Sequence, residues 1–153
     1  MSDDRAETFE SFFETAEPRL RRALVAAYGL ERGREAAAEA LAYGWERWDK
    51  VRGMRNPLGY LYRVGQSRTR ARKHPPVFDV PAQAGDIWFE PGLANALSEL
   101  SERQRLAVML VHGFGWQLAE VAEVTGIRVP TVQTHAERGL ARLRRALEVR
   151  DHV

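Results

Sequence analysis

The chain has 153 residues, of which 44% are hydrophobic, and its formal net charge is +2. It contains no cysteine, which excludes disulfides and thiolate metal sites and is consistent with a reducing cytoplasm. The acidic, polar N-terminus MSDDRAETFE is not a signal peptide, and no apolar run reaches the roughly 18 residues that a membrane span needs. We therefore expect a cytoplasmic globular protein without a membrane-inserted segment.

The small net charge hides a pattern of charged blocks. Residues 1–17 carry six acids, residues 50–74 carry eight Lys or Arg and no acid, and residues 75–102 carry five acids and no base. Residues 128–145 then carry five Arg and one Glu. Two basic blocks separated by an acidic one indicate two contacts with a polyanion, whereas the alternative is ordinary solvated helix faces.

Two helices are predicted in the first part of the chain. Residues 5–28 place apolar side chains three and four apart, which is the spacing of an amphipathic helix. Pro18 should kink or restart this helix, and Gly29 should end it. Residues 33–48 are rich in alanine and predict a second helix, whose Trp45 and Trp48 share a side and are expected in the core or at its rim.

A third helix should begin at Asn56 and Pro57, because Asn caps free amides and Pro fits the first helical turn. It should run to about residue 73, after a basic loop over 49–55. Its inward side is expected to carry Leu58, Leu61, Tyr62 and Gly65. Its outward side is expected to carry Arg63, Arg68, Arg70, Arg72 and Lys73, with Tyr60 nearby. A basic helix with interleaved aromatic residues suits phosphate contact and base stacking on a single strand, and the alternative is a solvated arginine-rich helix.

Residues 74–92 contain four prolines and two glycines, and we expect a linker because proline blocks both helix and central strand. This linker also carries four large apolar residues, so we expect it to dock on this chain or on a partner. They are Phe78, Ile87, Trp88 and Phe89.

The last part of the chain predicts helices over 93–100, 102–112 and 116–124, followed by a longer one. Ser101 should cap the second of these, and Gly126 should make a turn at positive φ. Pro130 should open the last helix, whose apolar stripe faces inward. The stripe consists of Val132, Ala136, Leu140, Leu143 and Leu147. Short helices with a tight turn before a basic helix are typical of a helix-turn-helix that enters a DNA major groove.

The outward face of the last helix has the side chains that read bases. Gln pairs with adenine, Arg with guanine, and Thr contacts either or a thymine methyl group. A helix N-terminus also attracts phosphate, while arginines further along suit the DNA backbone. The predicted duplex-binding set is Arg128, Pro130, Thr131, Gln133, Thr134, Glu137, Arg138 and Arg142.

Several stretches, taken together, resemble a known family. They are FESFFETAEPRLRRALVAAYG, WERWD and NPLGYLYRV, followed by LANALSELSERQRLAV and LAEVAEVTGIRVPTVQTHAERGLARLRRAL. In order and spacing they resemble the sigma factors of bacterial RNA polymerase, specifically the small two-domain extracytoplasmic-function (ECF) type. The resemblance implies an all-α fold of two small helical domains. These would be a sigma region 2-like bundle over 1–73 and a region 4-like helix-turn-helix domain over 93–153, joined by the Pro/Gly-containing linker 74–92.

The resemblance also implies a function and partners. The chain would direct core RNA polymerase to promoters and assist their opening, without being an enzyme and without a metal or cofactor. The first domain would dock on the coiled-coil of the largest polymerase subunit and capture the melted −10 strand. The second would read the −35 duplex and sit on the β flap. Many members of the family are also held inactive by an anti-sigma protein.

The resemblance assigns residues to two of these contacts. The −10 strand would be held by Arg52, Arg55, Asn56, Tyr60, Arg63, Arg68, Arg70, Arg72 and Lys73. Core polymerase would be met by Glu35, Ala38, Glu39, Trp45 and Trp48.

Some positions depart from the family's pattern. In the first domain the family has Ala-Glu-Asp-x-x-Gln, where this chain places Gly33 and Arg34 at the leading pair and Ala38 at the glutamine. In the recognition helix Pro130 replaces a usual Gly, and Gln133 replaces a frequent basic residue. Promoter preference can therefore not be transferred from typical members.

Two alternatives stay open at this point. The run TVQTHAERGLARL also resembles stand-alone regulators of the response-regulator type, which usually dimerise. A sigma-like interaction protein that has lost promoter function is the second alternative, prompted by Ala38 and by Gln66-Ser67 where an Asn is common. An enzyme is not expected, because the four histidines are scattered and no catalytic motif accompanies them.

Overall fold

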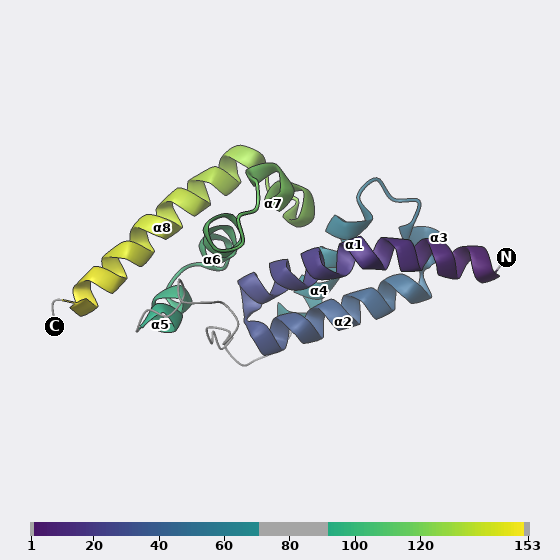
Figure 1. Ribbon diagram of the computed structural model, residues 1–153, viewed down its shortest axis with the longest axis horizontal. Helices are drawn as coiled ribbons and strands as arrows, with labels where there is room; N and C mark the ends of the chain where they lie inside the picture. The colour runs from purple at the N-terminus through teal and green to yellow at the C-terminus, as the bar shows by residue number, and fades with distance from the viewer. Residues whose placement is uncertain (1, 71–91, 152–153) are drawn as a thin grey trace.

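The structure is a computed structural model that describes residues 2–70 and 92–151 of the chain. Within these two ranges every regular element is a helix, which confirms the predicted all-α class (Figure 1). The elements are α1 (Ser2–Tyr28), α2 (Leu30–Glu46), α3 (Trp48–Val51), α4 (Pro57–Arg70), α5 (Leu93–Ser98), α6 (Glu102–Ala107), η2 (Val108–Gly113), α7 (Leu118–Thr125) and α8 (Val129–Asp151). None of the helices in these ranges is long and apolar enough to cross a bilayer. The predicted linker 74–92 lies outside the described residues except for Gly92.

We call α1 to α4 the first lobe and α5 to α8 the second lobe. In the first lobe, α1 and α2 lie side by side with α4 packed against both (Figure 1). The expectation that Pro18 restarts the first helix is wrong, because α1 runs without interruption from Ser2 to Tyr28. Proline inside a helix costs about 3 kcal/mol, but buried Ala16 and Leu20 on either side of Pro18 anchor both halves of α1 in one core.

Two glycines set how α1 meets α2. Gly29 ends α1 at a φ of 93°, as predicted, and the chain turns directly into α2. A Cβ atom at Gly33 would lie 2.4 Å from the Cα of Val25, so the backbones of the two helices approach too closely for any side chain there. This close approach gives a physical reason for the glycine at a position where the family usually has alanine.

The predicted start of α4 is confirmed by its cap. The Asn56 Oδ1 atom accepts a hydrogen bond from the Gly59 amide at 2.9 Å. The four residues predicted to face inward from this helix are all buried, namely Leu58, Leu61, Tyr62 and Gly65. The last three residues of the predicted helix, 71–73, lie outside the described residues.

The second lobe follows the prediction with one difference. Ser101 caps α6 in a capping box with Gln104, and Gly126 makes the predicted turn at a φ of 76°. The helix predicted over 102–112 is α-helical only to Ala107 and continues as the π-helical segment η2, where the Phe114 amide donates to the Met109 carbonyl. No feature of residue type in this segment predicts that change.

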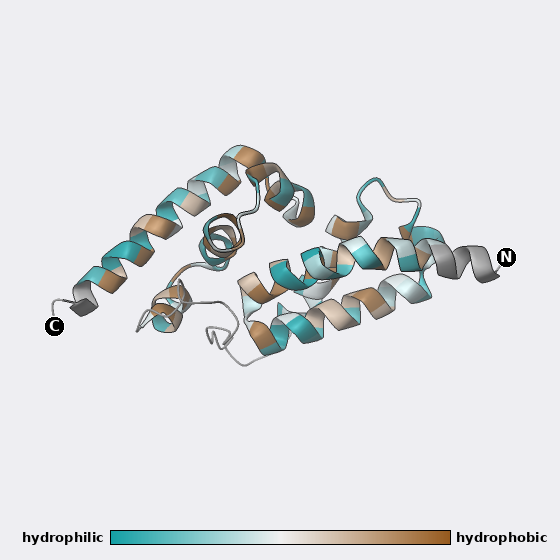
Figure 2. Cartoon of the chain, in the orientation of Figure 1, coloured by the Kyte–Doolittle hydropathy of each residue, from teal (hydrophilic) through white to brown (hydrophobic). Residues whose placement is uncertain are grey.

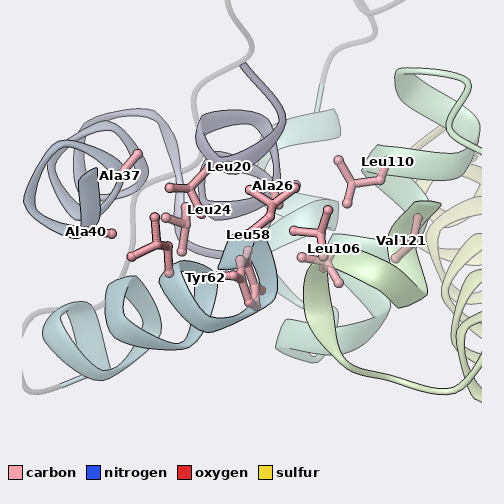
Figure 3. Close-up of a cluster of buried hydrophobic side chains, with 14 of the residues drawn as sticks. Leu20, Leu24, Ala26, Ala37, Ala40, Leu58, Tyr62, Leu106, Leu110 and Val121 are labelled. Carbon is pink, nitrogen blue, oxygen red and sulfur yellow. The ribbon is translucent and has the colours of Figure 1, made fainter. Parts of the chain in front are cut away.

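The two lobes share one hydrophobic core. Leu106, Leu110 and Val121 of the second lobe belong to the same buried cluster as side chains of α1, α2 and α4. Figure 3 shows these three residues beside Ala26, Leu58 and Tyr62. A second, smaller cluster lies within the second lobe. Sharing of a core compensates for the small size of each lobe, since small domains bury a low fraction of their surface.

Candidate nucleic-acid interfaces

The outer face of α8 presents most of the predicted duplex-binding side chains to solvent. Six charged or polar members are exposed, while Val132, Ala136 and Leu143 are buried on the inner side. The exposed members are Arg128, just before α8, and Gln133, Thr134, Glu137, Arg138 and Arg142 on it. Figure 2 shows hydrophilic and hydrophobic bands alternating along α8, as an amphipathic helix requires.

The contacts made by these side chains are local. The Gln133 amide donates to Glu137 at 3.3 Å, and the Thr134 hydroxyl donates to the Pro130 carbonyl at 3.1 Å. Both pairs are one turn apart on α8 itself, so no other element covers them. Pro130 is exposed and Thr131 is half-buried. The part of α8 predicted to read bases is thus displayed on a rigid helix.

Positive charge continues from the outer face of α8 onto α6. Arg142 is exposed and donates to Gln104 of α6 at 3.4 Å. Burial, together with the neighbouring Arg103 and Arg138, lowers the pKa of His135. Burial is the larger cause, and the two arginines add a positive field of the kind that also favours a bound phosphate.

The basic surface around α4 contains the described members of the predicted strand-binding set. Five arginines of the set are exposed and Tyr60 is half-buried, while Arg72 and Lys73 lie outside the described residues. The five arginines are Arg52, Arg55, Arg63, Arg68 and Arg70.

An open hollow lies on this surface between α2 and α4. It is lined by Tyr43, Tyr60, Arg63, Val64, Ser67 and Arg68. The hydroxyl groups of Tyr43 and Tyr60 lie 3.1 Å apart, and the Arg47 guanidinium lies 4.1 Å from the centre of the Tyr43 ring. Two aromatic rings with arginines around them form a site that can stack an unpaired base and hold its phosphate.

The sequence reasoning missed Tyr43 and Arg47. Both lie near the end of α2, and nothing in that helix marks its aromatic residue as a partner of Tyr60. The sequence carried no separate signal for this pair. The two tyrosines come together only because α2 and α4 pack against each other as antiparallel helices.

Two members of the strand-binding set do not face solvent freely. The Asn56 amide donates to the Glu123 carbonyl of the second lobe at 2.6 Å. Arg70 donates to the Glu102 carboxylate at 2.7 Å. In this structure the two ends of α4 therefore contact α7 and α6.

The predicted polymerase-binding residues lie mostly on the outer face of α2. Glu35 and Ala38 are exposed, Glu39 is half-buried and the Trp45 side chain is 43% exposed. Trp48 is only 2% exposed and packs inside the core, which agrees with the expected core or rim position and leaves it off the outer face of α2. Its position at the start of α3 turns the indole under α1, where its ring lies 5.0 Å from that of Phe12.

An apolar hollow adjoins this face. It lies between α1 and α2 and is lined by Phe9, Phe13, Ala38, Leu41 and Trp45 among others. Phe13 is 40% exposed beside this hollow. Exposed aromatic side chains beside a hollow are a usual mark of a protein-binding surface.

Comparison with known proteins matches both lobes. The family model "Sigma-70, region 4" matches residues 92–143. An RNA polymerase sigma-E factor of Streptomyces antibioticus is 35% identical over 126 residues, covering 73% of this chain and 68% of the relative. The chain belongs to the ECF group of RNA polymerase sigma factors. A sigma-E factor of Streptomyces coelicolor is 33% identical over 73% of this chain and 70% of its own length.

A solved structure shares the fold of this sigma factor. It is the complex of the sigma factor RpoE with the anti-sigma factor NepR from Bartonella quintana. The match has a TM-score of 0.65 at 21% identity and covers 94% of this chain and 98% of the other. Because the match extends over nearly the whole chain, the shared fold includes both lobes and not only the second.

Family membership excludes the first of the two alternatives left open by the sequence, the stand-alone regulator. A stand-alone helix-turn-helix regulator would share only the second lobe, yet the relatives match 73% of the chain. The predicted function, promoter-directed transcription initiation, is confirmed at the level of the family. Its members are initiation factors and not catalysts.

Proposed function

We propose that this sigma factor directs core RNA polymerase to promoters by reading duplex DNA with α8 and holding the melted strand on α4, while the polymerase performs all the chemistry. The observation that carries the proposal is the outer face of α8. Gln133 and Thr134 on this face are exposed and hydrogen-bond only to residues one turn away on the same helix. A surface of this kind, following a tight glycine turn, fits a major groove.

The first lobe supplies the second DNA contact. The hollow between Tyr43 and Tyr60 accepts an unstacked base, and exposed Arg63 and Arg68 at its edge bind the phosphates on either side. Stacking compensates the unstacking cost, which is a few kcal/mol per base, and so favours the opened promoter. The division of the chain into 1–73, 74–92 and 93–153 follows from these two tasks.

Core polymerase is the protein partner. The exposed face of α2 with Glu35 and Ala38, and the apolar hollow with Phe13 and Trp45, form one continuous contact surface for the coiled-coil of the largest subunit. Alanine at position 38 shifts this contact from hydrogen bonding towards apolar burial, because the family's glutamine is absent. The β flap and an anti-sigma protein are further partners of the second lobe and of the whole chain.

The test is a reconstitution with bacterial core polymerase. The tagged chain should retain core enzyme on a column, and the holoenzyme should start transcripts at defined positions on a genomic fragment library, read by sequencing of RNA 5′ ends. A matched control is Thr15→Ala, an exposed residue of α1 that lines neither the proposed DNA sites nor the apolar hollow of the proposed polymerase surface. Failure to bind core enzyme and to support any transcript would reject the proposal in favour of a sigma-like interaction protein.

Binding to core polymerase and binding to the melted strand can be tested separately. Trp45→Ala should weaken binding to core polymerase, since it removes an exposed aromatic anchor. Tyr60→Ala should leave core binding intact. It should destabilise the open promoter complex by about 1–3 kcal/mol per stacked base, which is measured as a shorter lifetime of that complex. Equal effects of Tyr60→Ala on both measurements would mean that α4 does not bind the strand independently.

A further inference from the structure

One acidic side chain lies among the arginines of the predicted duplex-binding block. Residues 128–145 carry five Arg and one Glu, and this one acid is Glu137, which is exposed on the outer face of α8. A carboxylate on a face that meets DNA repels the phosphate groups. Its position there is therefore unfavourable unless it has a role that compensates the repulsion.

A salt bridge within α8 is the ordinary role of such a residue, and the sequence excludes it. Ion pairs on a helix surface join residues three or four apart, and none of the four positions at these distances from Glu137 is basic. They are Gln133, Thr134, Leu140 and Ala141. Across residues 2–70 and 92–151, Glu137 has no ion pair and one hydrogen-bond partner, the Gln133 side chain. The one contact of this acid is thus with a side chain predicted to read a base.

The hydrogen bond between these two side chains fixes the orientation of the Gln133 amide. Its Nε2 atom lies 3.3 Å from the Oε1 atom of Glu137. Because a carboxylate only accepts hydrogen bonds, the amide atom that faces it must be the nitrogen and not the carbonyl oxygen. One N–H of Gln133 is then used by Glu137. The other N–H and the carbonyl oxygen remain, so Gln133 presents one donor beside one acceptor to a partner.

Adenine is the base whose major-groove edge matches one donor beside one acceptor. Its N7 atom can accept the remaining N–H of Gln133, and its N6 amino group can donate to the Gln133 oxygen. Guanine offers two acceptors, N7 and O6, and its O6 atom would face that oxygen. We propose that Glu137 is a positioning residue, which orients Gln133 for adenine and against guanine in the −35 duplex. This inference rests on the proposed function of α8.

The experiment uses the full chain in complex with core polymerase and a promoter library whose −35 duplex is randomised. Sequencing of the bound DNA gives the preference for adenine over guanine at each position. Gln133→Ala identifies the base pair that Gln133 contacts, because the preference should be lost there. Glu137→Gln keeps the size of the side chain, but its amide can also donate to the Gln133 oxygen and so no longer fixes the orientation of Gln133.

We expect Glu137→Gln to lower the preference for adenine over guanine about fivefold at that base pair, which is the lower end of what one bidentate pair contributes. Other positions should keep their preferences. In a Gln133→Ala background, Glu137→Gln should have no further effect on the preference, because Glu137 acts through Gln133. A residue that only stabilises α8 would not change the preference at a single base pair.

Glu148→Gln is the matched control, since Glu148 is exposed on α8 about three turns further along and the substitution removes the same charge. It should leave the preference unchanged at every position. An equal change in Glu148→Gln would overturn the inference, because it would report only the net charge of the helix.

Three further results would overturn the inference. The first is an unchanged preference in Glu137→Gln, and the second is a base pair of Gln133 at which the wild type does not prefer adenine. The third is a change in Glu137→Gln at a different base pair from that of Gln133, which would mean that Glu137 contacts a base itself. A wild-type holoenzyme without any base preference in the −35 duplex would instead contradict the proposed function of α8, so the two failures can be told apart.

Discussion

The outer face of α8 and the outer face of α4 carry similar side chains but have different surroundings. Gln133 and Thr134 on α8 bond only to residues one turn away, so that face is ready for a partner. Asn56 and Arg70 on α4 bond to Glu123 and Glu102 of the other lobe. Two proposed DNA-binding surfaces on one chain can thus differ in availability even when their composition is alike, and the difference depends on tertiary contacts.

The largest expected effect breaks the contact that joins the lobes. Arg105 is 6% exposed, and its guanidinium donates to the Ala27 carbonyl of α1 at 2.9 Å and to the Leu100 carbonyl at 3.1 Å. Arg105→Leu should lower the free energy of unfolding by about 3 kcal/mol, because buried carbonyls lose a charged donor. Urea denaturation followed by circular dichroism measures it.

Arg103→Leu is the control for that prediction, since Arg103 is exposed on the same helix. It should change the free energy of unfolding by less than about 0.5 kcal/mol. Similar losses in both variants would show that Arg105 contributes helix propensity and not a link between the lobes.

The next-largest effect concerns the packing of α1 against α2, the two helices on which α4 lies. Gly33→Ala places a Cβ atom 2.4 Å from the Val25 Cα atom, so α1 and α2 must move apart. We expect a loss of about 2 kcal/mol in the free energy of unfolding, as is typical for overpacking. Thermal unfolding measures the loss, and Gly53→Ala is the control because the nearest atom to its added Cβ lies 3.7 Å away. A Gly33→Ala chain as stable as wild type would show that the close approach is not required.

A smaller effect is expected on the exposed outer face of α8. Gln133→Ala should leave stability unchanged, since Gln133 bonds only to Glu137 on the surface. It should reduce discrimination at one base pair of the −35 duplex by about 1–3 kcal/mol, as expected for the loss of a bidentate pair. Selection of promoter variants by the holoenzyme, read by sequencing, measures this change. Arg142→Ala should instead weaken all sequences alike, since phosphate contacts carry no base information.

The smallest effect concerns the helix that carries Glu102. Ser101→Ala removes the hydroxyl that accepts from the Gln104 amide at 3.1 Å. We expect a loss of about 1 kcal/mol in the free energy of unfolding. Amide hydrogen exchange should locate faster opening in α6 and not in α8, and uniform acceleration through the second lobe would contradict a local role for the cap.

Much of this molecule could be predicted from local patterns. Asn56 with Pro57, Ser101, and Gly126 each fix the end of a helix through a bond or a dihedral angle within a few residues, and all were predicted correctly. The exposed face of α8 follows from helical periodicity alone. The family resemblance was equally local, since it depends on short runs in a fixed order.

The rest depends on contacts between distant segments. The continuity of α1 through Pro18 requires the core on both sides, and which of the two tryptophans is buried depends on the contact of Trp48 with Phe12. Tyr43 joins the site only because α2 and α4 pack together, and Glu102 reaches Arg70 only because the lobes touch. No periodicity within a single helix contains this information.

The bond between Arg105 and Ala27 also has a consequence for synthesis on the ribosome. The Ala27 carbonyl near the end of α1 is made 78 residues before the side chain that binds it. When the first lobe emerges, its apolar face and the end of α1 are therefore still in contact with water. The second lobe covers them only after α6 has left the exit tunnel. Long sequence separations of this kind slow folding, so a nascent chain paused in the linker should be the most vulnerable to proteases.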